Sequence, residues 1–222
     1  METVPWNVYQ NPFICRIYPP KNNNASNHVS ILIHGWTGNE VSMSVFHSAA
    51  TGPGLSIAPR GNISIAKEQY GWVDINSDPN QSFSRFKQIC MELHNSLRIV
   101  AQNLDQQFEN INLIGFSQGG VMAVILSLIY PQIYKNIALL STFLPEGLPV
   151  FQSSHLSKNR YFIAHGNRDE IVNFQQAHST QKYLTSLGAS VIFCQEDIGH
   201  KVGTQCLLNL KLFFRNSTRL EE

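Results

Sequence analysis

The chain of 222 residues carries little charge, because Asp, Glu, Lys and Arg together make up only 14% of it. Soluble domains usually contain about a quarter of such residues, so we expect Asn, Gln and Ser to keep the surface in water. Lysine and arginine form no run longer than two, and the formal net charge is +1. Both features argue against a nucleic-acid partner and against a polybasic membrane-binding segment.

Cysteines are few, and none of them lies in a C-x-x-C pair or at zinc-ligand spacing. The four are Cys15, Cys90, Cys194 and Cys206. Their scatter is typical of a reducing compartment, where thiols pack as small hydrophobic groups. The apolar stretches are far shorter than the ~20 residues that cross a bilayer, and the N-terminus lacks the pattern of a secretory signal. We therefore expect a cytoplasmic protein without a membrane span.

The length and the 43% of hydrophobic residues fit one domain over residues 1–222. Short apolar segments alternate with amphipathic ones along the chain, as strands and helices do. Strands are expected at 13–18, 28–33, 55–58, 111–114, 136–140, 161–164 and 189–194, and helices at 82–108, 121–129, 173–187 and 202–214. This order predicts an α/β fold with a mostly parallel central sheet and helices on both faces.

The strongest chemical signal is Gly115-x-Ser117-x-Gly119, which directly follows a predicted buried strand and precedes a helix. In this context the pattern is typical of the α/β-hydrolase fold, where a sharp turn lifts the serine hydroxyl above the sheet. Glycines on either side let the strand and the helix approach closely. An ordinary glycine-rich turn with an N-capping serine is the alternative. We predict that Ser117 is a nucleophile.

A serine nucleophile needs a base and an acid, which follow it along the chain in this fold. His200 lies in the loop after the last predicted strand, whereas His178 lies within an amphipathic helix. Asp169 lies in the loop after the preceding strand, with Glu170 and Asp197 as alternative acids. We predict that His200 is the base and that Asp169 holds its tautomer.

Acyl transfer also requires N–H donors for the oxyanion of the tetrahedral intermediate. One donor should be the backbone N–H of Gln118, the residue after the nucleophile, at a helix N-terminus. The other should come from the loop after strand 28–33, where we favour the N–H of Trp36 over that of Thr37. For His34 we expect a structural role, in which it bonds to neighbouring backbone.

With these residues placed, the chain resembles the phospholipase/carboxylesterase family of small α/β-hydrolases, which includes acyl-protein thioesterases, over about residues 13–214. The resemblance rests on an ordered set of segments: ILIHGWTGNE (31–40), APRG (58–61), YGWVDI (70–75), LIGFSQGG (113–120), LLSTFLP (139–145), HGNRDEIV (165–172) and GH (199–200). It implies an α/β-hydrolase fold, a triad and an oxyanion hole. The triad carries over onto Ser117, Asp169 and His200, and the oxyanion donors onto Trp36 and Gln118.

The sequence departs from the family where Trp36 and Thr37 replace a small or aliphatic residue and a glycine. A bulky tryptophan beside the oxyanion hole would narrow the alcohol side or the acyl side of the site. APRG and YGWVDI are more similar to the bacterial esterase branch than to the eukaryotic thioesterase branch, so no protein-deacylating activity is predicted.

The function expected is that of a serine carboxylesterase for short-to-medium acyl esters, with a small-molecule ester as partner and no metal or cofactor. A thioesterase or lysophospholipase with the same triad is the first alternative, and a catalytically silent binding scaffold is the second. The irregular segment 141–159 predicts an open site without a large helical lid. Residues 202–214 are a candidate apolar surface for a homodimer, and the sequence leaves open whether they are exposed.

An apolar acyl pocket is expected where loops leave the carboxyl ends of the strands. The residues hypothesised to line it are Trp72, Phe116, Phe143 and Leu144. Plain core positions are the alternative for each of the four.

Overall fold

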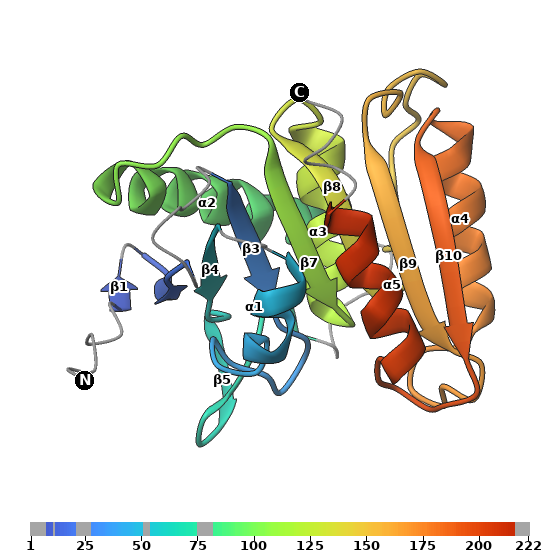
Figure 1. The fold of residues 1–222 in the computed structure, drawn as a ribbon, viewed down its shortest axis with the longest axis horizontal. Helices are drawn as coiled ribbons and strands as arrows, with labels where there is room; N and C mark the ends of the chain where they lie inside the picture. The colour runs from blue at the N-terminus through green and yellow to red at the C-terminus, as the bar shows by residue number, and fades with distance from the viewer. Residues whose placement is uncertain (1–7, 11, 21–27, 51–53, 75–81, 216–222) are drawn as a thin grey trace.

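The computed structural model of the protein describes residues 8–10, 12–20, 28–50, 54–74 and 82–215 (Figure 1). The strands are β1 (Val8–Gln10), β2 (Ile14–Tyr18), β3 (Val29–Ile33), β4 (Leu55–Pro59), β5 (Ile63–Ala66), β6 (Gln69–Gly71), β7 (Ile111–Phe116), β8 (Tyr134–Leu140), β9 (Arg160–Gly166) and β10 (Ser190–Glu196). The helices are α1 (Ser44–Ala50), α2 (Ser82–Asn103), α3 (Gln118–Ile129), α4 (Gln175–Ser186) and α5 (Thr204–Arg215).

Within the described residues, eight strands form one sheet in the order β1-β2-β4-β3-β7-β8-β9-β10. Every neighbouring pair from β4 to β10 is parallel, whereas β2 runs antiparallel to both β1 and β4. Strands β3 and β4 are buried at every position, which is why their sequences are continuously apolar. The predicted α/β fold with a mostly parallel sheet is confirmed.

Helices cover both faces of the sheet and make two separate cores. Helices α2, α3 and α4 pack on one face through side chains such as Leu93, Val124 and Leu184. Helices α1 and α5 lie side by side on the other face, in front of the sheet in Figure 1. Helix α3 is apolar on nearly all sides, because it lies between α2 and the sheet.

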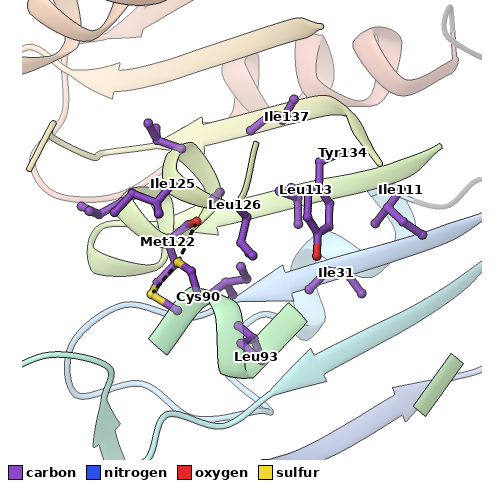
Figure 2. Close-up of a cluster of buried hydrophobic side chains, with 14 of the residues drawn as sticks. Ile31, Cys90, Leu93, Ile111, Leu113, Met122, Ile125, Leu126, Tyr134 and Ile137 are labelled. Carbon is purple, nitrogen blue, oxygen red and sulfur yellow. Dashed lines mark hydrogen bonds between the residues drawn. The ribbon is translucent and has the colours of Figure 1, made fainter. Parts of the chain in front are cut away.

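Figure 2 shows the core between α2, α3 and the sheet, where Leu113 and Ile137 project from neighbouring strands. The thiol of Cys90 on α2 lies 3.5 Å from the sulfur of Met122 on α3. Burial raises the pKa of the Cys90 thiol well above its ordinary value and that of Cys15 to about 12. These two cysteines are unpaired and act as small hydrophobic groups, as expected.

The expectation of four free thiols was wrong for the other pair, because Cys194 at the end of β10 forms a disulfide with Cys206 in α5. They lie 12 positions apart in the sequence, so no short cysteine motif marks the pair. The chain turns back after β10, which brings the first turn of α5 beside the strand with 5.8 Å between the two Cα atoms. The scattered cysteines therefore do not indicate a reducing compartment.

Several elements were not predicted: strand β1, helix α1 and the hairpin of β5 and β6. All are short, and β5 alternates half-buried and exposed positions, so none gives a long apolar period. Helix α2 ends at Asn103 instead of 108, and Asp105 follows with a positive φ of 54°. In α5, Phe213 and Phe214 are buried, which reduces the suggested apolar patch to Leu208 and Leu212. Among the described residues no helix is both long and apolar enough to cross a membrane.

Candidate active site

The predicted nucleophile, Ser117, lies in the turn between β7 and α3, with φ of 52° and ψ of −119°. A positive φ costs a residue with a side chain on the order of 1–3 kcal/mol, so it persists only where the surroundings fix it. The Ser117 N–H donates to the carbonyl of Leu140 at 2.8 Å. Its carbonyl accepts from the N–H of Gly120 at 2.9 Å and from Thr142 Oγ1 at 2.8 Å. The strained turn is thus held from β8 and from α3.

The glycines on either side of Ser117 are required by close packing. A Cβ atom on Gly119 would overlap the carbonyl of Ile33 in β3, and one on Gly115 would overlap the carbonyl of Gly119. The turn therefore lies directly against the neighbouring strand. The contacts agree with the sequence argument that small residues let the strand and the helix approach.

The structure brings the predicted acid and base together. Asp169 Oδ2 lies 2.7 Å from His200 Nδ1, and the side chain of the aspartate has no exposed surface. Asp169 Oδ1 accepts from the backbone N–H groups of Ile171 at 3.0 Å and Val172 at 2.9 Å. The imidazole of His200 retains 18% of its surface exposed, so a substrate can reach it.

The alternative residues lie elsewhere. Asp197 is exposed and forms an ion pair with Arg168 at 2.9 Å. Glu170 is exposed as well. His178 stacks on Phe193 with 5.0 Å between the ring centroids. None of these three side chains takes the place of Asp169 or His200.

His200 lies beside the serine turn. Its ring centroid is 4.9 Å from that of Phe116, the residue before Ser117 in the chain. Among the described residues, the hydrogen bonds from Asp169 through His200 do not extend to Ser117 Oγ. Catalytic hydrogen bonds often tighten only when a substrate is present, so the base role of His200 stays a prediction.

The loop after β3 passes next to the nucleophile. A Cβ atom on Gly35 would lie only 3.0 Å from Ser117 Cβ. The loop is a tight turn in which the Gly38 N–H donates to Gly35 O at 3.1 Å, and Thr37 has a φ of 65°. Trp36 thus lies on the loop that adjoins Ser117, and Gln118 is the first residue of α3. Their role as oxyanion donors remains a prediction.

His34 holds that loop in shape, as expected. Its Nδ1–H donates to Gly35 O at 2.7 Å, and its Nε2 accepts from the N–H of Gly61 at 2.9 Å. Burial lowers the pKa of His34 to about 4. The ring is therefore neutral near pH 7, which this pair of hydrogen bonds requires.

A buried ion pair beside this loop was not predicted. Arg60 Nε and NH2 donate to the two oxygens of the Glu40 carboxylate, each at 2.6 Å. Burial raises the pKa of Glu40, but the hydrogen bonds from Arg60, a backbone hydrogen bond and the charges of Arg60 and Arg16 together leave the pKa below its ordinary value. Glu40 ends the segment ILIHGWTGNE and Arg60 lies in APRG, so the motifs themselves were the available signal.

The Gln118 side chain anchors the segment after β6. Its Oε1 accepts from the N–H of Trp72 at 2.8 Å, and its Nε2 donates to Val73 O at 2.6 Å. The indole N–H of Trp72 donates to His34 O at 2.8 Å. Trp72 is only 1% exposed, so the structure places it in the core below the site.

A cavity of about 300 Å³ opens beside the serine turn, on the side of α1 and α5. Its apolar walls include Trp36, Met43, Phe46, Phe116 and Val202, with Thr37, Ser42 and Lys201 among its polar residues. Of the four residues predicted to line an acyl pocket, only Phe116 lines this cavity.

Phe143 and Leu144 are half-buried and pack on the core below α2 and α3. The walls from α1 were missed because that helix was not predicted. Segment 141–159 contains no α-helix and therefore no helical lid. Within the part of the chain that the structure describes, no group of three or more His, Cys, Asp or Glu side chains is arranged to hold a metal ion.

A sheet in this order, a serine in a strained strand-to-helix turn and an aspartate–histidine pair at the same edge are typical of the α/β-hydrolase fold. Residues 17–217 match the model of the family described as Phospholipase/Carboxylesterase. The chain belongs to this family.

Two curated relatives are similar to part of the chain. A probable carboxylesterase of Oryza sativa subsp. japonica is 29% identical over 117 residues, which cover 51% of this chain and 44% of the relative. Acyl-protein thioesterase 1 of Debaryomyces hansenii is 28% identical over 124 residues, which cover 53% of each chain. The matches thus span about half the length of these relatives.

Solved structures share the fold over nearly the whole chain. The carboxylesterase of Bacillus cereus has a TM-score of 0.82 at 20% identity, covering 94% of this chain and 96% of that one. The carboxylesterase of Mesorhizobium loti has a TM-score of 0.79 at 18% identity, covering 91% and 94%. At these identities the likeness concerns the fold alone.

Proposed function

We propose that the protein is a serine carboxylesterase that hydrolyses short-to-medium acyl esters through an acyl-enzyme on Ser117. The observation that carries the proposal is the buried Asp169 carboxylate, 2.7 Å from the Nδ1 of a partly exposed His200, beside the strained serine turn. A carboxylate on Nδ1 keeps the proton there and leaves Nε2 free to accept one.

In the first half-reaction, His200 Nε2 takes the proton of the Ser117 hydroxyl while Oγ attacks the ester carbonyl carbon. The tetrahedral intermediate collapses as its bond to the alcohol oxygen breaks, and the leaving alcohol takes the proton from His200. In the second half-reaction, His200 takes a proton from water and the hydroxide attacks the acyl carbon. The acid leaves, and the proton returns to Ser117 Oγ.

The oxyanion that forms in both steps is assigned to the backbone N–H groups of Trp36 and Gln118. Two observations support the assignment: the turn of residues 35–38 lies against Ser117, and Gln118 begins α3. A helix N-terminus carries partial positive charge, which favours a developing anion.

The preference for short-to-medium acyl groups is supported by the cavity of about 300 Å³. This volume lies at the lower end of the range of about 300–1,000 Å³ for small-molecule sites. Its walls are mainly apolar, so it suits a hydrocarbon group more than a charged one. A chain-length series of p-nitrophenyl esters tests this: activity should peak at short or medium chains, and a peak at long chains would contradict it.

A thioesterase with the same triad is the second candidate, since one relative is named acyl-protein thioesterase 1. The chemistry at Ser117 would be identical, so only substrate comparison separates the two. Matched oxygen esters and thioesters of one acyl group, assayed side by side, should give a higher kcat/KM for the oxygen ester. A large preference for the thioester would favour the second candidate.

A fluorophosphonate probe tests the nucleophile directly. We expect one label per chain, which peptide mass spectrometry locates at Ser117 and which Ser117→Ala abolishes. Circular dichroism of the variant should match the wild type, because alanine leaves the turn and its glycines in place. A labelled Ser117→Ala variant would refute the assignment, and an inert wild type would favour a binding scaffold.

The cytoplasmic location expected from the sequence stays a prediction, and the disulfide of Cys194 and Cys206 weighs against it. Disulfides persist mainly in oxidising compartments.

A further inference from the structure

A second histidine contacts the acid of the proposed triad. His165 lies near the end of β9, four residues before Asp169, and its side chain has no exposed surface. Its Nε2 is 2.9 Å from the carbonyl oxygen of Val172 and 3.2 Å from Asp169 Oδ2. The same Oδ2 atom accepts the hydrogen bond from His200 Nδ1. One carboxylate oxygen therefore lies between two imidazoles.

The contacts decide the tautomer of His165. Both groups near Nε2 are acceptors, so Nε2 must carry the proton. Nδ1 is buried and has no hydrogen-bond partner among the described residues. A proton there would leave an unpaired N–H in the interior, which is costly. The ring thus holds one proton, on Nε2, which it donates to Val172 O, and Asp169 Oδ2 lies close to the same nitrogen.

We propose that His165 is a positioning residue for Asp169, an inference that rests on the proposed function. The carboxylate has four N–H groups around it: Ile171 N and Val172 N at Oδ1, and His200 Nδ1 and His165 Nε2 at Oδ2. The two backbone donors hold Oδ1, and the buried His165 ring contacts Oδ2, with Nε2 at 3.2 Å. These contacts restrict rotation of the carboxylate plane away from His200.

The bond to Val172 O adds a second constraint. His165 and Val172 are joined by this bond, while the N–H of Val172 donates to Asp169 Oδ1 at 2.9 Å. The bond thereby ties the loop that carries Asp169 back to β9, the strand that precedes it. Loss of the His165 donor should free both the loop and the carboxylate, and the effect should appear in the chemical step more than in substrate binding.

Two substitutions separate the hydrogen bond from the volume of the side chain. His165→Gln places an amide N–H near the position of Nε2, whereas His165→Leu fills similar space without a donor. We expect His165→Leu to lower kcat by about 10- to 100-fold with KM unchanged. Residues that orient the directly acting groups of a site usually have effects of this size. His165→Gln should keep most of kcat.

His155 provides a control, because it lies in the segment between β8 and β9 and contacts the last turn of α3. His155 Nε2 bonds to Leu128 O at 2.8 Å, a contact of the same kind away from the site. His155→Leu should leave kcat unchanged although it removes a histidine–carbonyl bond. Equal kcat in His165→Leu and the wild type, or equal losses in the Gln and Leu variants, would overturn the proposal.

Two spectroscopic measurements need no ester hydrolysis, so they separate this proposal from the proposed function. Nitrogen-15 NMR of the wild type should show the Nε2-protonated tautomer of His165, and an Nδ1-protonated ring would overturn the proposal even if a variant fails to fold. The downfield Nδ1–H signal of His200, assigned by its loss in His200→Ala, should shift in His165→Leu and not in His155→Leu. An unmoved signal would count equally against it.

Discussion

The nucleophile turn and the loop that carries His200 reach the same edge of the sheet by different means. The turn spans Gly115 to Gly120, and contacts at neighbouring positions hold it: glycines against β3 and hydrogen bonds to the Ser117 backbone. The His200 loop joins β10 to α5, and its partner Asp169 lies 31 residues away in sequence.

Three further contacts fix the His200 loop. The disulfide of Cys194 and Cys206 closes it at its base. The Glu196 carboxylate accepts from the first N–H groups of α5, including that of Cys206 at 2.8 Å. A Cβ atom on Gly166 would overlap the carbonyls of Ile198 and Gly199, so the loop lies directly on the end of β9. The comparison shows that local sequence shapes the nucleophile turn, whereas the base depends on distant partners.

The largest loss of activity should follow from breaking the contact between Asp169 and His200. Asp169→Asn removes the negative charge and can place an N–H donor opposite His200 Nδ1, which disfavours the required tautomer. We expect kcat for a short-chain ester to fall by about 10⁴-fold, as for acids of other serine triads. Asp197→Asn is the control, because that carboxylate is exposed and pairs with Arg168. Similar losses in both variants would mean that Asp169 is not the acid.

Acid should weaken the region around the nucleophile through His34. Its folded-state pKa is lowered from 6.5 to about 4, so between these values the unfolded chain binds more protons than the folded one. The free energy of unfolding should therefore fall as pH drops from about 6.5 to about 4, by about 3 kcal/mol in total. Urea unfolding across this range measures it. His34→Gln should flatten the slope, and an equally steep slope in the variant would exclude His34 as its source.

Reduction should loosen the His200 loop and spare the serine turn. Opening the Cys194–Cys206 disulfide frees a loop of 12 residues, which is worth about 2 to 3 kcal/mol in the free energy of unfolding. Urea unfolding with and without a dithiol reductant measures the loss. A Cys194→Ser, Cys206→Ser double variant should show the same loss without reductant. A reductant effect of equal size in that variant would locate the cause elsewhere.

The smallest expected effect compares one glycine from each region. Gly119→Ala introduces a Cβ atom that overlaps Ile33 O, so it should cost about 2 kcal/mol of stability and disturb Ser117. Gly199→Ala, next to His200, places its Cβ 3.7 Å from the nearest atom, Arg168 O, in ordinary contact. Thermal unfolding should therefore respond to the first change and hardly to the second. The reverse order would contradict the idea that close packing specifies the serine turn.

The parts of the fold that the sequence predicted are those with an apolar period or a continuous apolar run. Helix α2 was predicted from its amphipathic period, whereas β3, β7 and α3 were predicted from continuous apolar runs, because these elements are buried on all sides. Helix α1 and the β5–β6 hairpin were not predicted, since short and partly exposed elements carry little pattern. The cavity was misplaced for this reason: two of its walls, Met43 and Phe46, come from α1 and the segment just before it.

Sequence reasoning proposed Ser117, Asp169 and His200 from chain order and loop position, and the structure joins the last two. It did not predict that His165 shares the same carboxylate, although both residues lie in the segment HGNRDEIV. It also missed the disulfide of Cys194 and Cys206. The disulfide leaves no local signal because it depends on how β10 and α5 turn toward one another, and the His165 contact depends on the path of the loop after β9, which its residue types do not specify.

The sequence by itself determined the order of strands and helices, the glycine-flanked serine turn and the family. These depend on burial period and on backbone geometry, which a few adjacent residues specify. Only the tertiary structure decided which cysteines pair, which imidazoles surround Asp169 and where a cavity opens. The disulfide, the His200 contact and the cavity join segments far apart in the chain, so they arise from the packing of the whole sheet and no short stretch of sequence contains them.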